Sequence, residues 1–204
     1  MVDVPKGWQL PTHDAIRVED IECLSDNWYH LYRVTFDLRR QNGEWQRQQR
    51  EAYDRGNGAG ILLYNRTDRT VILTRQFRLP TFVNGTQDGM LIEVPAGLLD
   101  DRDPAAAVIA EVQEETGYKI GKPQKLFDLF MSPGSVTERL HLFMAEVTKE
   151  YQTGKGGGLH EEGEDIHVLE TPFDEAIAMV ADGRIRDAKT VILLQHAQLA
   201  KTFD

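Results

Sequence analysis

The sequence has only one cysteine among its 204 residues, Cys23. An intrachain disulfide is therefore excluded, and a single thiol without a neighbouring histidine is more often a core or surface residue than a nucleophile. The chain also lacks an uninterrupted apolar stretch long enough to span a bilayer. Its first ten residues lack the basic start and apolar middle of a signal peptide. We therefore predict a cytoplasmic protein without a membrane partner.

Positive charge is scarce as well, because 23 lysines and arginines stand against 33 acidic residues, which gives a formal net charge of -10. Nucleic-acid binding depends on basic surfaces that neutralise phosphates, so we expect no nucleic-acid partner. An acidic protein can still bind an anionic diphosphate where carboxylates hold divalent cations, because the metal reverses the local charge. Clustered glutamates are therefore the feature to look for.

The pattern of apolar and polar residues predicts alternating strands and helices in a globular α/β protein. Residues 28–54 are predicted to form an antiparallel hairpin around Asn42-Gly43, which suits a type I′ turn. A helix is predicted from an acidic cap at Asp103 to a stop at Gly117. The glycine-rich residues 154–158 predict a mobile loop. Further strands are predicted at 61–64, 71–73, 90–94, 125–131, 139–147 and 165–169, and further helices at 172–181 and 188–201.

Two glutamates of the predicted helix, Glu111 and Glu115, stand four residues apart and should share one face, with Cβ atoms about 5–6 Å apart. Like charges at this spacing destabilise an isolated helix, and the dipole also disfavours anions near a helix C-terminus. Hard divalent cations with oxygen ligands would compensate for both effects. From the spacing alone, a solvated acidic face remains an equal alternative.

The residues around this pair resemble the Nudix box, G-x5-E-x7-R-E-U-x-E-E-x-G-U, in which U is a bulky apolar residue. Gly97 corresponds to the opening glycine, Glu111 to the Glu of the Arg-Glu pair, Glu114 and Glu115 to the Glu-Glu pair, and Gly117 to the closing glycine. The resemblance implies a loop, helix and loop that hold Mg²⁺ against a substrate diphosphate. It implies Glu111, Glu115 and the carbonyl of Ala96 as metal ligands, with Glu114 in a supporting role.

The sequence departs from the box at two points. The stretch between Gly97 and Glu111 is one residue short, so that Arg102 or Asp103 stands where a Glu is expected. Ala110 replaces the usual Arg, which pairs with box carboxylates in the family. The carboxylates must therefore be oriented from elsewhere in the chain.

The resemblance extends to the GDP-mannose pyrophosphatase branch of the Nudix family, which is related to ADP-ribose pyrophosphatases. It is carried by residues 53–59, 75–78, 82–85, 131–134 and 183–190. It implies a Nudix α/β/α sandwich with a mixed sheet at 56–204, preceded by a β-hairpin extension of antiparallel strands at 1–55. It also implies a homodimer in which the N-terminal strands contribute to dimerisation and contact the substrate.

A hydrolase also needs a group that activates water, and an acidic stretch follows the glycine-rich residues. A loop carboxylate can be brought to the metals when a lid closes. In the ADP-ribose pyrophosphatase relatives the base lies in this loop before an Asp-Ile pair, which here is Asp165-Ile166. The resemblance therefore implies Glu162 as the catalytic base and Glu164 as the second candidate, against the alternative of a solvated acidic loop.

Other positions are candidates for binding the substrate. Guanidinium groups match phosphate oxygens, although each arginine is as well explained by a surface salt bridge. A Ser-Pro-Gly sequence is also typical of an ordinary turn. The candidates for phosphate or sugar contacts are Arg55, Arg75 and Arg78, and those for the wall beside the metals are Ser132, Gly134 and Glu138.

Together these features predict Mg²⁺-dependent hydrolysis of a nucleoside diphosphate sugar, with two or more Mg²⁺ ions and Mn²⁺ as a substitute. The first hypothesis is cleavage of GDP-mannose to GMP and mannose 1-phosphate. The enzymatic alternative is cleavage of ADP-ribose, which contains the same diphosphate. A third reading is a sensor that binds nucleotide sugars without cutting them.

Overall fold

The structure, a computed structural model, describes residues 2–204, except that the side chain of Glu162 lies outside the described residues. The chain divides into two compact units. Unit 1 contains the chain up to Asn57 together with Phe130–Arg139, and unit 2 contains Gly58–Leu129 and Leu140–Asp204. The polypeptide therefore passes between the units three times.

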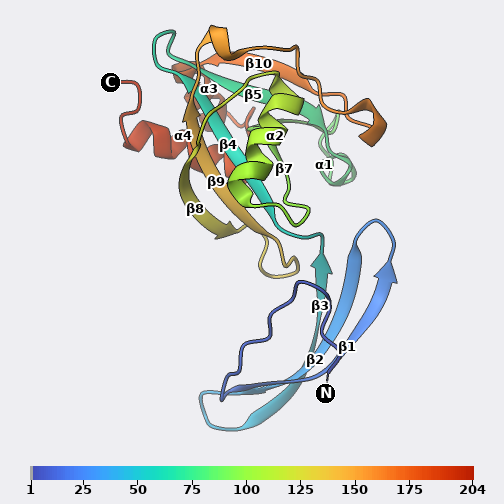
Figure 1. The fold of residues 1–204 in the computed structure, drawn as a ribbon. Coiled ribbons are helices and arrows are strands. Elements are labelled where there is room, and N and C mark those ends of the chain that lie inside the picture. The colour runs from blue at the N-terminus through green and yellow to red at the C-terminus, as the bar shows by residue number, and fades with distance from the viewer. Residues whose placement is uncertain (1) are drawn as a thin grey trace. The chain divides into compact units, whose positions relative to one another are not determined.

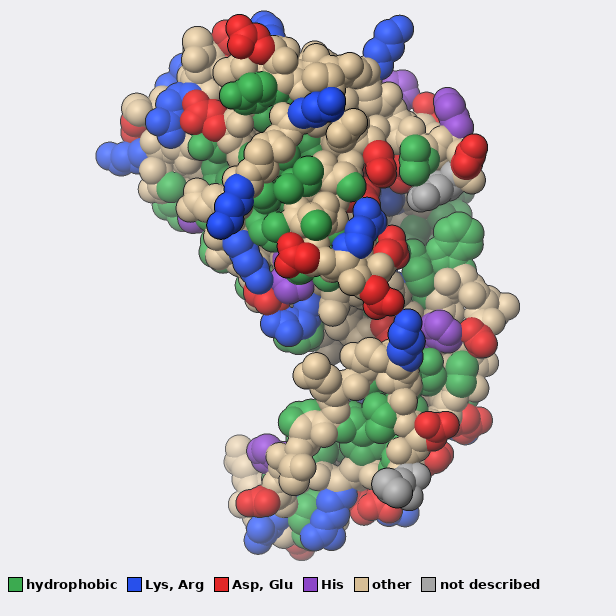
Figure 2. All heavy atoms as spheres, in the orientation of Figure 1, with side chains coloured by type: hydrophobic (Ala, Val, Ile, Leu, Met, Phe, Trp, Pro, Cys, Tyr) green, Lys and Arg blue, Asp and Glu red, His purple; other side chains and the backbone are tan. Residues whose placement is uncertain are grey.

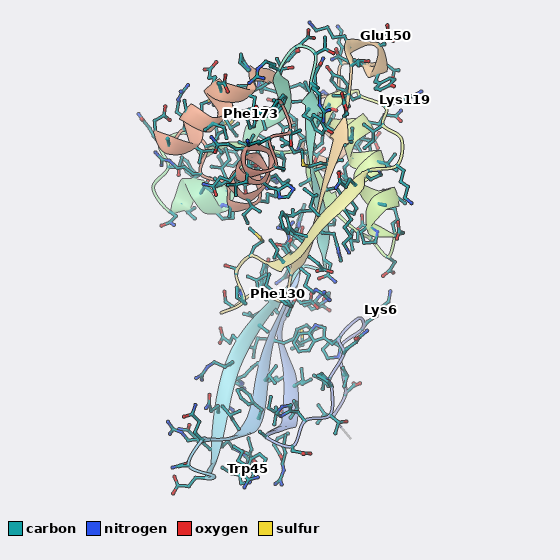
Figure 3. The ribbon with its side chains drawn as sticks, turned by 90° about the vertical axis from the view of Figure 1, so that its left-hand side faces the viewer. Lys6, Trp45, Lys119, Phe130, Glu150 and Phe173 are labelled. Carbon is teal, nitrogen blue, oxygen red and sulfur yellow. The ribbon has the colours of Figure 1, made fainter. Side chains whose placement is uncertain are left out.

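Unit 1 is built on a three-stranded antiparallel sheet in the order β1-β2-β3. The strands are β1 (Ile16–Asp26), β2 (His30–Arg39) and β3 (Trp45–Asp54). The predicted hairpin is confirmed as β2 and β3, which pair from His30↔Asp54 to Arg39↔Trp45. Gly43 supplies the left-handed φ of 87° in its turn, and Figure 3 labels Trp45 just after this turn.

The strand β1 was not predicted. Its pairing with β2 shifts register twice, between Val18 and Asp20 and between Cys23 and Ser25. Each irregularity interrupts the two-residue alternation of apolar and polar side chains by which a strand is recognised. The N-terminal extension is therefore a three-stranded sheet that includes the predicted hairpin.

Unit 2 contains a mixed seven-stranded sheet in the order β10-β5-β4-β9-β8, with β6 paired to β5 and β7 paired to β4. Pairing is parallel between β4 and β9, whereas β4 pairs antiparallel with β5 and β7. Its central strand β4 is buried along nearly all of its length, as expected for a strand covered on both faces. The strands are β4 (Gly58–Asn65), β5 (Thr70–Phe77), β6 (Met90–Glu93), β7 (Ala96–Leu98), β8 (Gln124–Phe130), β9 (Arg139–Glu146) and β10 (His167–Pro172).

Helices cover both faces of this sheet, with α2 on one face and α3 and α4 on the other (Figures 1 and 3). Unit 2 is therefore an α/β/α sandwich, as predicted. The helices are α1 (Leu79–Val83), α2 (Pro104–Thr116), α3 (Phe173–Ala181) and α4 (Ala188–Leu199), with 3-10 turns η1 (Lys149–Tyr151) and η2 (His160–Glu162). No helix within residues 2–204 is long and apolar enough to cross a membrane.

The core between α2 and the sheet fixes the position of the predicted box helix. Its members are apolar side chains of which less than 4% of the surface is exposed. Each fully buried aliphatic side chain contributes about 1.5–3 kcal/mol. The members are Ala59, Ile61, Leu63, Ile72, Val108, Val112, Tyr118, Phe143 and Val147.

Both ends of α2 agree with the prediction. The Asp103 carboxylate accepts hydrogen bonds from the backbone N–H groups of Ala105 (3.0 Å) and Ala106 (3.2 Å). Gly117 ends the helix with a left-handed φ of 76°. The segment before the helix contains a further short strand, β7 (Ala96–Leu98), which was not among the predicted strands.

Candidate active site

Glu111 on α2 lies directly over Gly97 on β7. A Cβ atom at position 97 would overlap the Glu111 carboxylate, so this position can accept only glycine while the carboxylate stays in place. Only 15% of the Glu111 side chain is exposed. The glycine that opens the segment therefore makes space for a carboxylate that is largely removed from water.

Glu115 lies one helical turn further along α2 and is only 2% exposed. Its Oε2 accepts a hydrogen bond from the backbone N–H of Ala96 at 3.2 Å. Burial, together with the nearby carboxylates of Glu111 and Glu164, raises the pKa of Glu115 to about 8. The alternative of a solvated acidic face is therefore wrong for this residue.

Glu111 is similarly perturbed. Burial and the neighbouring Glu114 carboxylate raise the pKa of Glu111 to about 7, against the opposing effect of Arg102. Nη2 of Arg102 lies 3.5 Å from Oε1 of Glu111. The two residues before Arg102, Asp100 (φ 46°) and Asp101 (φ 65°), have left-handed backbone conformations that turn the loop at this point. Arg102 thus supplies a cation beside the box from the loop, whereas Ala110 leaves none on the helix.

The other two acidic residues of the prediction occupy different surroundings. Glu114 is exposed, consistent with a supporting place beside the carboxylates rather than among them. Glu164 is partly buried, and its Oε2 accepts a hydrogen bond from the N–H of Leu159 at 2.9 Å. Its charge acts on both Glu111 and Glu115. The side chain of Glu162 lies outside the described residues, so the predicted base stays a prediction.

A largely buried polar cluster formed by Arg78, Glu93, Asp187, Lys189 and Thr190 lies beside Glu115. The Nζ atom of Lys189 lies 2.6 Å from Oε1 of Glu93 and 3.0 Å from Oδ1 of Asp187. Nε of Arg78 donates to Oε2 of Glu93 at 2.8 Å. Thr190 joins the cluster to the residue that follows β6, because its Oγ1 accepts from the N–H of Val94 at 2.8 Å. Two cations and two anions balance in this cluster.

Electrostatics explains why this cluster is charged although it is buried. Burial disfavours the charged forms of Glu93 and Lys189. Lys189 and Arg78 nevertheless hold the pKa of Glu93 below its ordinary value. Glu93 and Asp187 in turn raise the pKa of Lys189 against the effect of burial. The cluster therefore stays ionised, and Arg78 counteracts the raised pKa of Glu115.

Arg75, the other predicted substrate-binding arginine of unit 2, lies in a more open place. Nη2 of Arg75 forms an ion pair with Asp88 at 2.8 Å, and both side chains are substantially exposed. Exposed pairs of this kind contribute little to stability, about 0–1 kcal/mol. The arrangement leaves the salt-bridge interpretation of Arg75 open beside the substrate-binding one.

Four predicted substrate-binding residues lie in unit 1. Nε of Arg55 is 3.5 Å from Oε1 of Glu138, and its guanidinium lies 5.3 Å from the centre of the Tyr29 ring. The carbonyl of Ser132 accepts hydrogen bonds that close the turn at 132–136, in which Gly134 is exposed. The structure thus brings Arg55 and Glu138 together, and their contact with a substrate stays a prediction.

The residues around α2 fit a divalent cation. Among residues 2–204, leaving out the Glu162 side chain, no group of three His, Cys, Asp or Glu side chains is arranged to hold a metal alone. Mg²⁺ does not require such a cage, because it usually binds one or two carboxylates, substrate phosphates and waters. Glu111 and Glu115 offer oxygen ligands whose mutual repulsion a cation would relieve.

The face of unit 2 that carries α2 shows acidic and basic side chains intermixed (Figure 2).

Two known family models match the chain and identify its family. The NUDIX domain model matches residues 54–195, and the model of the GDP-mannose pyrophosphatase NudK N-terminal domain matches residues 15–53. The chain belongs to the Nudix family. Glu111, Glu114 and Glu115 lie within the residues that match the NUDIX domain model.

Curated Nudix relatives match most of the chain. A GDP-mannose pyrophosphatase of Pectobacterium atrosepticum is 58% identical over 89% of this chain and 93% of its own length. One of Klebsiella pneumoniae is 55% identical over 90% and 91%, and one of Salmonella typhimurium is 54% identical over 90% and 95%. A crystal structure of an ADP compounds hydrolase matches with a TM-score of 0.69 and 18% identity, covering 93% of this chain and 95% of that chain. This last likeness supports the Nudix fold.

Proposed function

We propose that this Nudix protein hydrolyses the diphosphate of GDP-mannose to GMP and mannose 1-phosphate with the help of Mg²⁺. The observation that carries the proposal is the pair of buried carboxylates, Glu111 and Glu115, held between α2 and β7. The substrate is inferred from relatives of 54–58% identity that are named GDP-mannose pyrophosphatases. Water adds to one phosphorus, and the P–O–P bond breaks to give the two monophosphates.

Glu111, Glu115 and the carbonyl of Ala96 are proposed to hold the cations, with Glu114 beside them. Bound Mg²⁺ would neutralise phosphate charge and acidify water, with Mn²⁺ as a substitute. Both glutamates must lose their protons to act as ligands, and their raised pKa values oppose this in the metal-free protein. Cation binding should therefore release protons near neutral pH.

The proton of the attacking water is proposed to pass to the acidic loop after the glycine-rich residues. Glu162 is the first candidate, and Glu164 is the second. Support for this loop comes from Glu164, whose charge acts on Glu111 and Glu115. Loss of turnover in Glu162→Gln with normal turnover in Glu164→Gln would assign the base to Glu162, and the reverse result would assign it to Glu164.

Further parts of the proposal concern the substrate and the assembly. Arg78 is held by Glu93 next to the box and is proposed to bind a phosphate, with Arg75 as a second contact. Unit 1 is proposed to support a homodimer and to contact the sugar nucleotide through Arg55, Ser132, Gly134 and Glu138. Sedimentation at micromolar concentration tests the assembly, because a monomer would contradict it.

The decisive assay incubates the protein with Mg²⁺ and either GDP-mannose or ADP-ribose, and identifies the products by chromatography. GMP and mannose 1-phosphate should form fastest, whereas faster cleavage of ADP-ribose would change the substrate but keep the mechanism. Binding without cleavage of either compound would indicate a sensor. Glu115→Gln should abolish turnover, and Glu146→Gln should not, because Glu146 is exposed and pairs with Tyr64 at the opposite end of β4.

A further inference from the structure

The glycine-rich residues, predicted to be mobile, are packed against the C-terminal end of α2. Gly156, Gly157 and Gly158 all have left-handed backbones, with φ of 66°, 115° and 77°. Such a run is open to glycine but disfavoured for other residues. The chain enters it through Thr153, whose N–H donates to the carbonyl of Gly117 at 2.8 Å.

This run donates backbone hydrogen bonds to carbonyls that a helix cannot satisfy by itself. The N–H of Gly157 donates to the carbonyl of Glu115 at 2.9 Å, and that of Gly158 donates to the carbonyl of Glu114 at 3.2 Å. The last carbonyls of a helix have no partner within the helix and carry its negative dipole end. The two bonds therefore attach the run to the turn of α2 that carries the proposed metal ligand.

The run lies so close to its neighbours that a side chain is excluded at its first and at its last residue. A Cβ atom at Gly156 would overlap the carbonyl of Glu115. At Gly158 it would overlap the carboxylate of Glu164 and come within 3.0 Å of Cδ1 of Ile166. The same Glu164 carboxylate accepts the N–H of Leu159, the next residue along the chain. Backbone contacts thus connect α2 to Glu164 within a few residues.

We propose that Gly156–Gly158, here called the glycine clasp, is a positioning element that holds the Glu164 carboxylate beside the box glutamates. The proposal rests on the proposed function, in which the acidic loop serves the reaction. The clasp supplies no reacting group. It fixes the geometry of the second candidate for the base, Glu164, by joining the loop to the backbone of α2.

The test is a double-mutant cycle between Gly158→Ala and Glu164→Gln. Gly158→Ala should lower kcat about 10- to 100-fold and change KM by less than about threefold, because displacing a reacting group by about 1 Å has costs of this order. In the Glu164→Gln background the same substitution should lower kcat by less than about twofold, because the displaced group is already gone. Equal losses in both backgrounds, or normal turnover in Glu164→Gln, would overturn the proposal.

Two matched controls separate positioning from general disturbance. Gly154→Ala adds a methyl group in ordinary contact with Gly117, with the nearest atom at 3.7 Å. Gly183→Ala carries the same left-handed backbone strain, at φ 81°, with no atom closer than 3.9 Å, in the turn before α4. Both should leave kcat within about threefold of the wild type. A loss in either control equal to that of Gly158→Ala would contradict the proposal.

A readout without metal or substrate keeps the inference separate from the proposed function. In the metal-free wild type, the amides of Gly157, Gly158 and Leu159 should exchange slowly with deuterium. Glu164→Ala should speed exchange at Leu159 and leave Gly157 and Gly158 protected, whereas Gly158→Ala should speed exchange at all three. Fast exchange of these amides in the wild type would overturn the clasp. Absence of turnover in the wild type with slow exchange would refute only the proposed activity.

Discussion

Replacing Glu115 by glutamine should make the metal-free protein more stable at alkaline pH. The unfolded chain titrates this group near its ordinary pKa of 4.5, whereas the folded protein raises it to about 8. A raised folded-state pKa gives stability that is present below pH 4.5 and is lost as the pH rises to about 8. Glutamine has the same shape and carries no charge, so the variant should not lose stability through this group.

The size of the effect follows from the two pKa values. The full shift corresponds to about 5 kcal/mol, at about 1.4 kcal/mol per pH unit. Because the group is half ionised near pH 8 and the site can rearrange, we expect about 3 kcal/mol at that pH, or roughly 6–12 °C in the unfolding midpoint. Near pH 5 the two proteins should differ by less than about 1 kcal/mol.

The assay follows thermal unfolding with EDTA between pH 5 and pH 8.5, and repeats it with Mg²⁺. Glu111 is present in both proteins, so their difference reports the ionisation of Glu115 together with its repulsion of Glu111. Parallel pH dependences of the wild type and Glu115→Gln would refute the reasoning. Mg²⁺ should stabilise the wild type most strongly at high pH and the variant hardly at all, because binding requires the deprotonated carboxylate.

Three further perturbations test the surroundings of this residue. Gly97→Ala should lower kcat/KM about 10- to 100-fold by displacing Glu111. The control Gly121→Ala, whose new methyl group meets no atom within 4 Å, should leave kcat/KM unchanged. Equal kcat/KM values for the two variants would contradict the contact between Gly97 and Glu111. Arg102→Ala should raise the pKa of Glu111 further and move the acidic limb of Mg²⁺ binding, measured by calorimetry, to higher pH by about half a unit. Lys189→Met should lower the free energy of unfolding in urea by about 3 kcal/mol, because buried Glu93 loses one of its two cations; the exposed Lys125→Met should change it by less than about 0.5 kcal/mol.

Sequence reasoning succeeded where structure is encoded by neighbouring residues. The helix α2 was predicted at both ends because Asp103 caps its N-terminus and Gly117 ends it, and both signals are local. The buried strand β4 was predicted for the same reason, as a continuous apolar run. The family resemblance then assigned meaning to Glu111 and Glu115, which spacing alone left undecided.

Long-range contacts and irregular backbone conformations could not be predicted from the sequence. The ion pair of Lys189 with Glu93 joins residues 96 positions apart, and no local pattern indicates which partner a helical lysine finds. Arg102 faces Glu111 because Asp100 and Asp101 adopt left-handed conformations, which are unusual for residues other than glycine. The composition of the glycine clasp predicts a mobile loop, because composition indicates the conformational freedom of a chain and not the hydrogen-bond partners of its amide groups.

Unit 1 is made of two separate stretches of the chain, which has a consequence for its folding during synthesis on the ribosome. The end of β3 is paired with the 132–137 turn, through Tyr53 N–H to the Ser135 carbonyl at 2.8 Å and Thr137 N–H to the Tyr53 carbonyl at 3.1 Å. Tyr53 and Thr137 are 84 residues apart. At about 5–20 residues per second, the first strands wait roughly 4–17 s for the turn that completes them. Meanwhile residues 58–129 are synthesised, which contain nearly all of the strands β4 to β8, so unit 1 cannot be completed until most of the unit 2 sheet has been made.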